Sequence, residues 1–146
     1  MIVKVIKLNE NANIPFKIYS NDFCYDVVAV SEEEIAPNVW KYGTGLAFEI
    51  ETPFLDPHNF SLDCRPRSSI YKTGMVLSNS CGTIDLDYRG EVSFIFYHVM
   101  PNLPRYKVGD KIGQIKLGKT EPLKFILVEA LTKTPRGKEG FGSTGN

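Results

Sequence analysis

Residues 91–99 of the chain read EVSFIFYHV, and apolar Val92, Phe94 and Phe96 alternate there with their neighbours. A period of two is the pattern of a β-strand that buries one face. Similar runs occur along the whole chain: around Val3 and Val5, YDVVAV at 25–30, GLAFEI at 45–50, GMVLSN at 74–79 and KFILVEAL at 124–131. Each run is short, rich in β-branched or aromatic residues and bounded by turn-forming residues, so each predicts a strand.

Turns are abundant between these runs, because the chain has 12 glycines and 9 prolines spread along its length. No window sustains an apolar helical stripe over three turns. One short helix is expected after Pro66, from Ser68 to Lys72, where Gly74 would end it. The pattern predicts an all-β domain of sandwich or jelly-roll type.

The chain is balanced in charge. Its 146 residues suffice for one compact core and not for two ordinary domains. Lys plus Arg number 17 and Asp plus Glu number 17, so the net charge is zero. A nucleic-acid binder usually has a basic surplus, so we expect no nucleic-acid partner and favour a small phosphorylated ligand held by local cations.

The three cysteines are widely spaced and form no CxxC pair, which argues against a zinc site. The first residues, MIVKVIKLNE, contain no apolar run long enough for a signal peptide or a membrane span. We therefore expect an intracellular protein with reduced thiols and no membrane partner.

The stretch CGTIDLDYRGEV at 81–92 is the first candidate for chemistry. In a strand, Asp85 and Asp87 would project from the face opposite Ile84, and Tyr88 would begin a turn into the next strand. The carboxylates would then sit on a rigid hairpin, which suits a base that must not move. Taken alone, the string is more typical of an acidic, solvated hairpin face.

The stretch RPRSS at 65–69 carries groups that bind phosphate. Arg67 offers a planar set of donors, and Ser68 and Ser69 add hydroxyls and N–H groups near the expected helix start. Taken alone, it could be an ordinary basic turn.

The last residues, PRGKEGFGSTGN at 135–146, are rich in glycine and should form a mobile tail unless something binds them. Arg136, the glycine N–H groups and the hydroxyls of Ser143 and Thr144 are all anion-binding groups. Phe141 has no core of its own to join, so it either belongs to a generic tail or stacks on a planar group such as a base.

Two weaker signals remain. Asp26 lies in FCYDVVA at 23–29, where a lone Asp usually faces solvent, and Gln114 lies in VGDKIGQI at 108–115, which indicates a Gly-Asp turn into a strand.

Taken together and in order, GTIDLDYRGEV, PRSS, GDKIGQI and RGKEGFGSTG resemble the motifs of the trimeric dUTPase family. The resemblance implies the jelly-roll-like β-clip fold of that family, with one short helix and a flexible C-terminal arm. It implies a β domain over residues 1–134 and an arm over residues 135–146 that closes over an active site. The implied reaction is hydrolysis of dUTP to dUMP and pyrophosphate, which limits uracil incorporation into DNA and supplies dUMP for dTMP synthesis.

The resemblance also implies roles for single residues. Asp85 would activate the water that attacks the α-phosphate, and Tyr88 would pack under the deoxyribose and exclude a ribose 2′-hydroxyl. The turn before Asp85 would bind uracil through Asn79, Gly82, Thr83 and Ile84. The phosphates would be bound by Arg67, Ser68, Ser69 and Gln114.

The implied cofactor is Mg²⁺, with Asp26 holding waters on the ion. The arm would supply Arg136, Phe141, Gly142, Ser143 and Thr144, with Phe141 on the uracil ring. Family members are trimers that share arms and sites between subunits, so the resemblance implies a homotrimer.

Some positions depart from the family pattern. Phe23-Cys24 stand where Ala-Gly is usual, Ser69 stands where Gly is frequent, and Gly113 stands where Ala is common. The first change puts the backbone around Asp26, and with it the metal assignment, in question.

Two alternative functions compete with this one. A dCTP deaminase shares the fold and an RSS string, but it needs a catalytic Glu where this chain has Ile95, and it lacks the Gly-Phe-Gly-Ser-Thr arm. A module that binds dUTP and signals to a partner is the other alternative; the carboxylate of Asp85 argues against a purely binding role.

Overall fold

The computed structural model describes residues 1–52 and 59–140. Its elements are β1 (Ile2–Lys7), β2 (Tyr25–Val28), β3 (Ser31–Ala36), β4 (Val39–Gly43), β5 (Leu46–Glu51), β6 (Asn59–Arg65), the 3-10 helix η1 (Ser68–Lys72), β7 (Met75–Leu77), β8 (Gly82–Asp85), β9 (Ser93–His98) and β10 (Lys111–Thr120). The all-β prediction and the short helix are confirmed. In this part of the chain no helix is long and apolar enough to cross a membrane.

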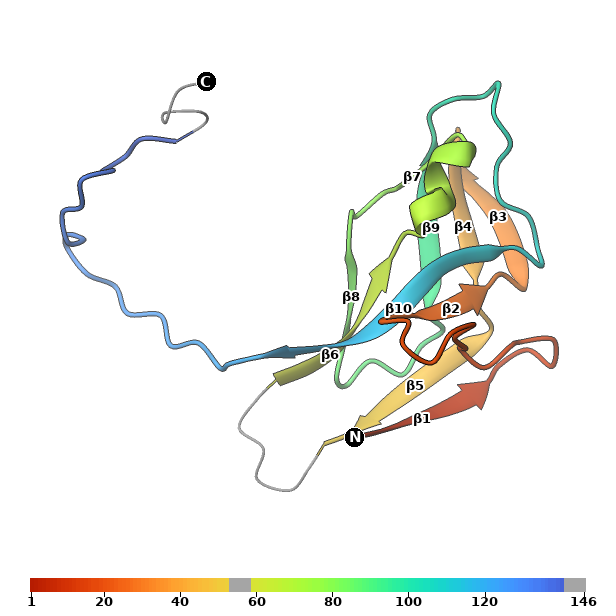
Figure 1. Cartoon of the computed structure of the whole chain (residues 1–146), viewed down its shortest axis with the longest axis horizontal. Coiled ribbons are helices and arrows are strands. Elements are labelled where there is room, and N and C mark those ends of the chain that lie inside the picture. Colours follow the sequence, from red (N-terminus) through yellow and green to blue (C-terminus); the bar gives the residue numbers. More distant parts are fainter. Residues whose placement is uncertain (53–58, 141–146) are drawn as a thin grey trace.

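The strands form two four-stranded sheets and one two-stranded ribbon (Figure 1). Sheet I has the order β2-β10-β6-β8, sheet II has the order β3-β4-β9-β7, and the ribbon joins β1 to β5. Every ladder is antiparallel. Strands distant in sequence thus become neighbours, as in β10 beside both β2 and β6.

The core is built from alternate residues of strands in both sheets. Phe94 and Phe96 of β9 are buried, as are Phe60, Leu62 and Cys64 of β6, while the residues between them are at least partly accessible to solvent. The period of two in the sequence therefore corresponds to one buried face on each of these strands.

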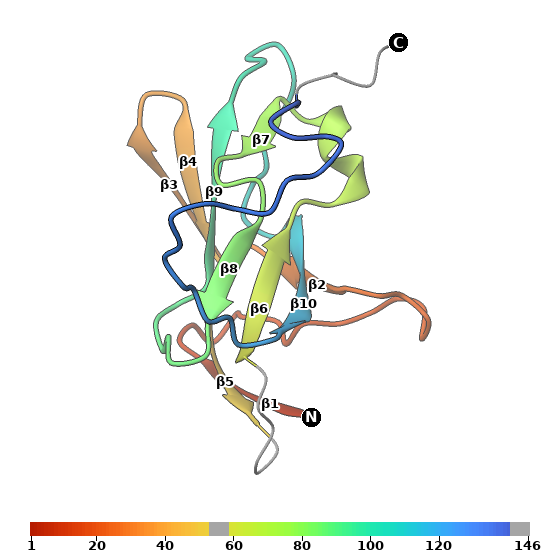
Figure 2. The ribbon, with the colours of Figure 1, turned by 90° about the vertical axis from the view of Figure 1, so that its left-hand side faces the viewer.

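The segment 81–92 differs from the expected hairpin. Strand β8 pairs with β6 in sheet I, whereas β9 pairs with β4 and β7 in sheet II. Strand β8 ends at Asp85, and a hydrogen bond from Tyr88 N–H to the Asp85 carbonyl (3.2 Å) closes a turn. The chain after β8 therefore crosses from one sheet to the other (Figure 2), so Asp87 does not extend the alternation that includes Asp85.

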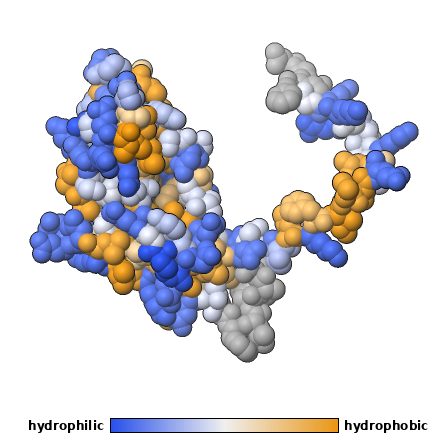
Figure 3. All heavy atoms as spheres, turned by 180° about the vertical axis from the view of Figure 1, so that it is seen from behind, coloured by the Kyte–Doolittle hydropathy of each residue, from blue (hydrophilic) through white to orange (hydrophobic). Residues whose placement is uncertain are grey.

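The strand predicted for residues 124–131 is wrong for the single chain. Strand β10 ends at Thr120, and residues 121–140 contain no helix or strand. The segment extends away from the body of the molecule (Figure 1) and exposes apolar side chains along its length (Figure 3). A strand needs a neighbouring backbone to satisfy its N–H and C=O groups, and none lies beside this segment in the described part of the chain.

Gly113 explains one departure from the family pattern. A methyl group on Gly113 would lie 2.7 Å from Cζ and 2.9 Å from Cδ1 of Phe94, which is 1% exposed. Because residue 113 of β10 has no side chain, there is room for the Phe94 ring of the opposite sheet.

We predict that Gly113→Ala destabilises the protein by about 1–3 kcal/mol, because neither backbone nor buried ring can move freely. The free energy of unfolding in urea measures this effect. Gly140→Ala is the matched control, since nothing lies within 4 Å of the added methyl group. Equal stability of the two variants would contradict the packing argument.

Candidate functional site

The polar face of sheet I carries three of the candidate residues, Asp26, Asp85 and Gln114. Directly paired residues of an antiparallel ladder share a face. The register pairs Ser61 with Asp85, and it pairs Arg65 with Gln114, which in turn pairs with Asp26. Since Phe60, Leu62 and Cys64 of β6 point into the core, these five residues lie on the side of the sheet away from the core.

Asp26 is the centre of a cluster of positive and amide groups. Its Oδ1 accepts hydrogen bonds from Gln114 Nε2 (2.9 Å) and Arg67 Nε (3.3 Å). Its Oδ2 forms an ion pair with Lys111 Nζ (3.1 Å). Asp26 is only 6% exposed, so the expectation of a solvent-facing strand residue is wrong. The sequence placed Asp26, Arg67 and Gln114 far apart, and the fold brings them together.

These contacts determine the charge state of Asp26. Burial by itself raises the pKa of its carboxyl group, but the hydrogen bonds from Gln114 and Lys111 and the charge of Arg67 outweigh burial and lower the pKa below its ordinary value. The carboxylate is therefore ionised and orients the three donors around it.

Lys111 is a member of this cluster that the sequence did not reveal. Simple alternation along β10 would place Lys111 and Gln114 on opposite faces. The register shifts between Lys111 and Gly113, and Lys111 then pairs with Val28 on the same face as Asp26. Its ammonium group also lies 4.8 Å from the centroid of the Phe16 ring.

The RPRSS segment lies beside the same cluster. Arg67 precedes η1 in an extended conformation, and its Nη1 donates to Ser69 Oγ at 3.4 Å. Ser68 is exposed at the first position of η1. The Arg67 guanidinium group therefore links the Ser69 hydroxyl to the Asp26 cluster, and together with Lys111 and Gln114 it forms a set of donors suited to phosphate oxygens.

The turn between β7 and β8 contains the residues predicted to bind uracil. Asn79 is exposed, Ser80 has a left-handed backbone (φ 58°), and Gly82 begins β8. A methyl group on Gly82 would lie 3.0 Å from Asn79 Nδ2 and 3.3 Å from Cys64 Cβ. The Asn79 amide therefore lies against Gly82, while Thr83 and Ile84 continue along β8.

Asp85 and Tyr88 lie at the other end of β8. Asp85 is exposed, and its carboxylate makes no hydrogen bond or ion pair within the described residues. Tyr88 is 45% exposed and donates from Oη to the Glu91 carbonyl (3.1 Å). An unpaired, accessible carboxylate can accept a proton from a water molecule.

One chain does not bring the two groups of residues together. The partner of Asp85 on β6 is Ser61, and the partner of Gln114 is Arg65, four residues further along. At about 3.3 Å per residue this is a separation of ~13 Å along the strand. Asp85 and Asp26 also lie on opposite edge strands of sheet I.

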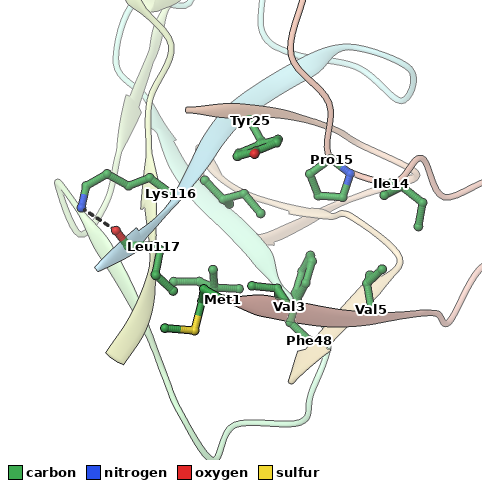
Figure 4. A pocket seen from close by; sticks show the side chains of 11 residues that line it. Met1, Val3, Val5, Ile14, Pro15, Tyr25, Phe48, Lys116 and Leu117 are labelled. Atoms are coloured by element: carbon green, nitrogen blue, oxygen red, sulfur yellow. Dashed lines mark hydrogen bonds between the residues drawn. The ribbon is translucent and has the colours of Figure 1, made fainter. Parts of the chain in front are cut away.

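A well-formed apolar cavity lies elsewhere. It has a volume of about 390 Å³ and is lined mainly by apolar side chains from the ribbon and from β6 and β10, among them Val3, Val5, Phe48 and Leu117 (Figure 4). Among the described residues that line it, Lys116 is the single cationic side chain, and that ammonium group is paired with Asp63 at 2.7 Å. An apolar cavity of this kind does not suit a triphosphate.

The arm is described only in part. Arg136 is exposed, and its Nε donates to the Glu139 carbonyl at 3.1 Å. Phe141, Gly142, Ser143 and Thr144 lie outside the described residues.

The residues around Asp26 fit a metal ion only if the ion is held through a bound water molecule. No group of three His, Cys, Asp or Glu side chains in residues 1–52 and 59–140 could hold an ion directly. A carboxylate has about four acceptor positions, and the donors on Asp26 use three of them. Asp26 can thus accept a hydrogen bond from a metal-bound water, which fits an ion carried by ligand phosphates.

We predict that Asp26 contributes a stability that depends on pH. Because its pKa is lowered in the folded state, the contribution is complete above the unfolded-state pKa, near 4, and is lost as the pH falls through the folded value. Asp26→Asn should lower the free energy of unfolding by about 1–3 kcal/mol at pH 7, and the deficit should shrink below pH 4. Urea unfolding across pH 2–7 measures it, with exposed Glu10→Gln as control. A deficit that does not vary with pH would contradict this assignment.

Comparisons with known proteins agree with the geometry. A family model described as dUTPase matches residues 10–145. The deoxyuridine 5'-triphosphate nucleotidohydrolase of Nautilia profundicola is 36% identical over 147 residues, which cover 99% of both chains.

Solved structures show the same fold. A mutant dUTPase of Staphylococcus bacteriophage 80alpha, with dUpNHpp, has a TM-score of 0.80 at 20% identity and covers 99% of both chains. A mutant dUTPase of phage phi11 of S. aureus, described with a structural Mg(II) ion, has a TM-score of 0.69 at 19% identity and covers 91% of this chain and 100% of its own.

The family match spans nearly the whole chain, and it includes the Asp26 cluster, the β7–β8 turn and the segment that carries Asp85 and Tyr88. The chain therefore belongs to the dUTPase family, the enzymes that hydrolyse dUTP.

Proposed function

We propose that this dUTPase hydrolyses dUTP to dUMP and pyrophosphate by attack of a water molecule on the α-phosphate, with Asp85 as the base. The observation that carries the proposal is the state of Asp85 at the end of β8: its carboxylate is exposed and unpaired within the described residues. A fixed base that needs no other partner is available to orient and deprotonate water.

The cluster around Asp26 receives the phosphates. Arg67, Lys111 and Gln114 are already oriented by one carboxylate, so binding a triphosphate requires little further ordering of their side chains. Ser68 and Ser69 add hydroxyl donors. Bound Mg²⁺ would neutralise phosphate charge, with Asp26 holding its waters.

Uracil lies in the turn before β8, where Asn79, Gly82, Thr83 and Ile84 offer backbone groups and one amide. This turn is narrow, because Asn79 packs directly on Gly82. A 5-methyl group would find no room, and the amino group of cytosine would meet donors with the wrong polarity. Tyr88 packs under the deoxyribose and excludes a 2′-hydroxyl.

The working unit is a homotrimer with shared sites. The separation of ~13 Å along β6 between Asp85 and the Asp26 cluster of one chain supports a site to which a second copy contributes one of the two groups. Residues 1–134 form the β domain, and residues 135–146 form the arm that closes over a site with Arg136, Phe141, Gly142, Ser143 and Thr144. The substrate is a cellular nucleotide, which agrees with an intracellular protein.

The exposed segment before the arm supports association. Leu123, Phe125, Ile126, Leu127 and Leu131 are between 70% and 100% exposed. Burial of so large an apolar surface on another subunit is a strong driving force for association. The strand pattern of residues 124–131 is then satisfied by pairing with a neighbouring subunit, and that pairing cannot form in one chain.

We predict that Asp85→Asn retains dUTP binding and loses about 10²–10⁴-fold in kcat, because the amide cannot accept the proton. Pyrophosphate release with dUTP, dCTP, dTTP and UTP measures turnover and selectivity. Asp87→Asn is the matched control, since Asp87 lies in the turn after β8. Unchanged turnover of Asp85→Asn would remove Asp85 from the role of base. If the unaltered protein binds dUTP in Mg²⁺ but does not turn it over, the alternative of a binding module is favoured.

Two truncations separate the arm from the association segment. Ending the chain after Thr134 should cripple turnover and leave the trimer intact, because the arm closes the site and does not build the core. Ending it after Thr120 should also abolish the trimer. Light-scattering mass and pyrophosphate release measure both effects. Full activity without residues 135–146 would contradict the role of the arm.

A further inference from the structure

The ring of Tyr88 is held in one place by residues that follow it in the turn into β9. Tyr88 Oη donates to the carbonyl oxygen of Glu91 at 3.1 Å. The ring lies directly over Gly90, so that a methyl group on Gly90 would lie 2.6 Å from Tyr88 Cζ and 3.1 Å from Cε2. The ring can adopt this position only because residue 90 has no side chain.

The carboxylate of Glu91 anchors this residue, and with it the carbonyl that accepts from Tyr88. Glu91 Oε1 accepts a hydrogen bond from Gly45 N–H at 2.7 Å. The carboxylate occupies the space over Gly43, where a methyl group would lie 3.1 Å from Glu91 Cδ. Glu91 therefore fastens the turn after β8 to the turn that joins β4 to β5.

The next residue strengthens this anchor. Val92 N–H donates to the Leu46 carbonyl (2.9 Å), and the Val92 carbonyl accepts from Thr44 Oγ1 (2.7 Å). Thr44 and Val92 are each 1% exposed. The support under Tyr88 thus belongs to the buried core, although the residue Tyr88 is 45% exposed.

We propose that Gly90 and Glu91 are positioning residues that fix the Tyr88 ring in the orientation that discriminates dUTP from UTP. This inference rests on the proposed contact between Tyr88 and deoxyribose. A steric test for one hydroxyl group requires a surface that does not yield, and a tyrosine that is free to rotate would move aside. The hydrogen bond to the Glu91 carbonyl and the bare backbone of Gly90 remove that freedom.

The test compares kcat/KM for dUTP and for UTP. Gly90→Ala should displace the ring and lower the dUTP:UTP ratio by at least about tenfold, since one steric contact is worth ~10–200-fold in discrimination. Glu91→Ala removes the acceptor of Gly45 N–H and should lower the ratio in the same direction, whereas Glu91→Gln retains an acceptor oxygen and should lose less of it. Tyr88→Ala gives the ratio in the absence of a ring.

Gly74→Ala is the matched control, because its added methyl group would lie 2.8 Å from His98 Cδ2 and so crowds the fold far from Tyr88. It should lower the melting temperature and leave the dUTP:UTP ratio unchanged. If Gly90 and Glu91 only stabilised the fold, their variants would also lower the melting temperature and leave the dUTP:UTP ratio unchanged.

The outcomes are distinguishable. If Tyr88→Ala lowers the ratio while Gly90→Ala and Glu91→Ala keep it, the positioning proposal is overturned and the role of Tyr88 stands. If Tyr88→Ala keeps the ratio of the unaltered enzyme, the proposed contact with deoxyribose fails, and the positioning proposal fails with it.

Discussion

Strand β6 pairs with β10 on one side and with β8 on the other, and the register of these two ladders positions Gln114 and Asp85 on one face. Phe60, Leu62 and Cys64 commit one face of β6 to the core. A shift by one residue would turn Asp85 or Gln114 into that core and leave a buried polar group without partners. The burial of three apolar side chains therefore fixes the orientation of the polar face.

The polar face is organised by charge pairing. Asp26 is nearly buried and ionised, and it is neutralised by Arg67 and Lys111 together with the amide of Gln114. The net charge of the chain is zero, so its field as a whole does not attract an anion. Attraction of an anion would instead come from the side chains that Asp26 has already oriented. Cations held in this way lose little further side-chain entropy when they bind phosphate.

Much of the fold and part of the site were predictable from local pattern. The strand containing Phe94 and Phe96, the helix after Pro66 and the chemical groups at Arg67 and Asp85 follow from period and residue type, whereas the roles expected of Asp26 and Gln114 came from the family resemblance. Strands β3, β4 and β6 were missed; β3 shows no apolar alternation over Glu32–Glu34, and Glu33 and Glu34 are exposed at a sheet edge. Lys111 was missed because a register shift in β10 changes the face on which it lies.

By itself the sequence determined the β class, the turn positions and the family, because periodicity, glycine, proline and short motifs are local properties. Only the tertiary structure decided that residues 81–92 cross between two sheets, that Lys111 joins Asp26, and that Gly90 and Glu91 support Tyr88. It also left residues 124–131 without a strand partner in the single chain. The physical reason is the same in each case: backbone pairing and charge pairing join residues that are distant in the chain, and no local pattern records which partner will be present.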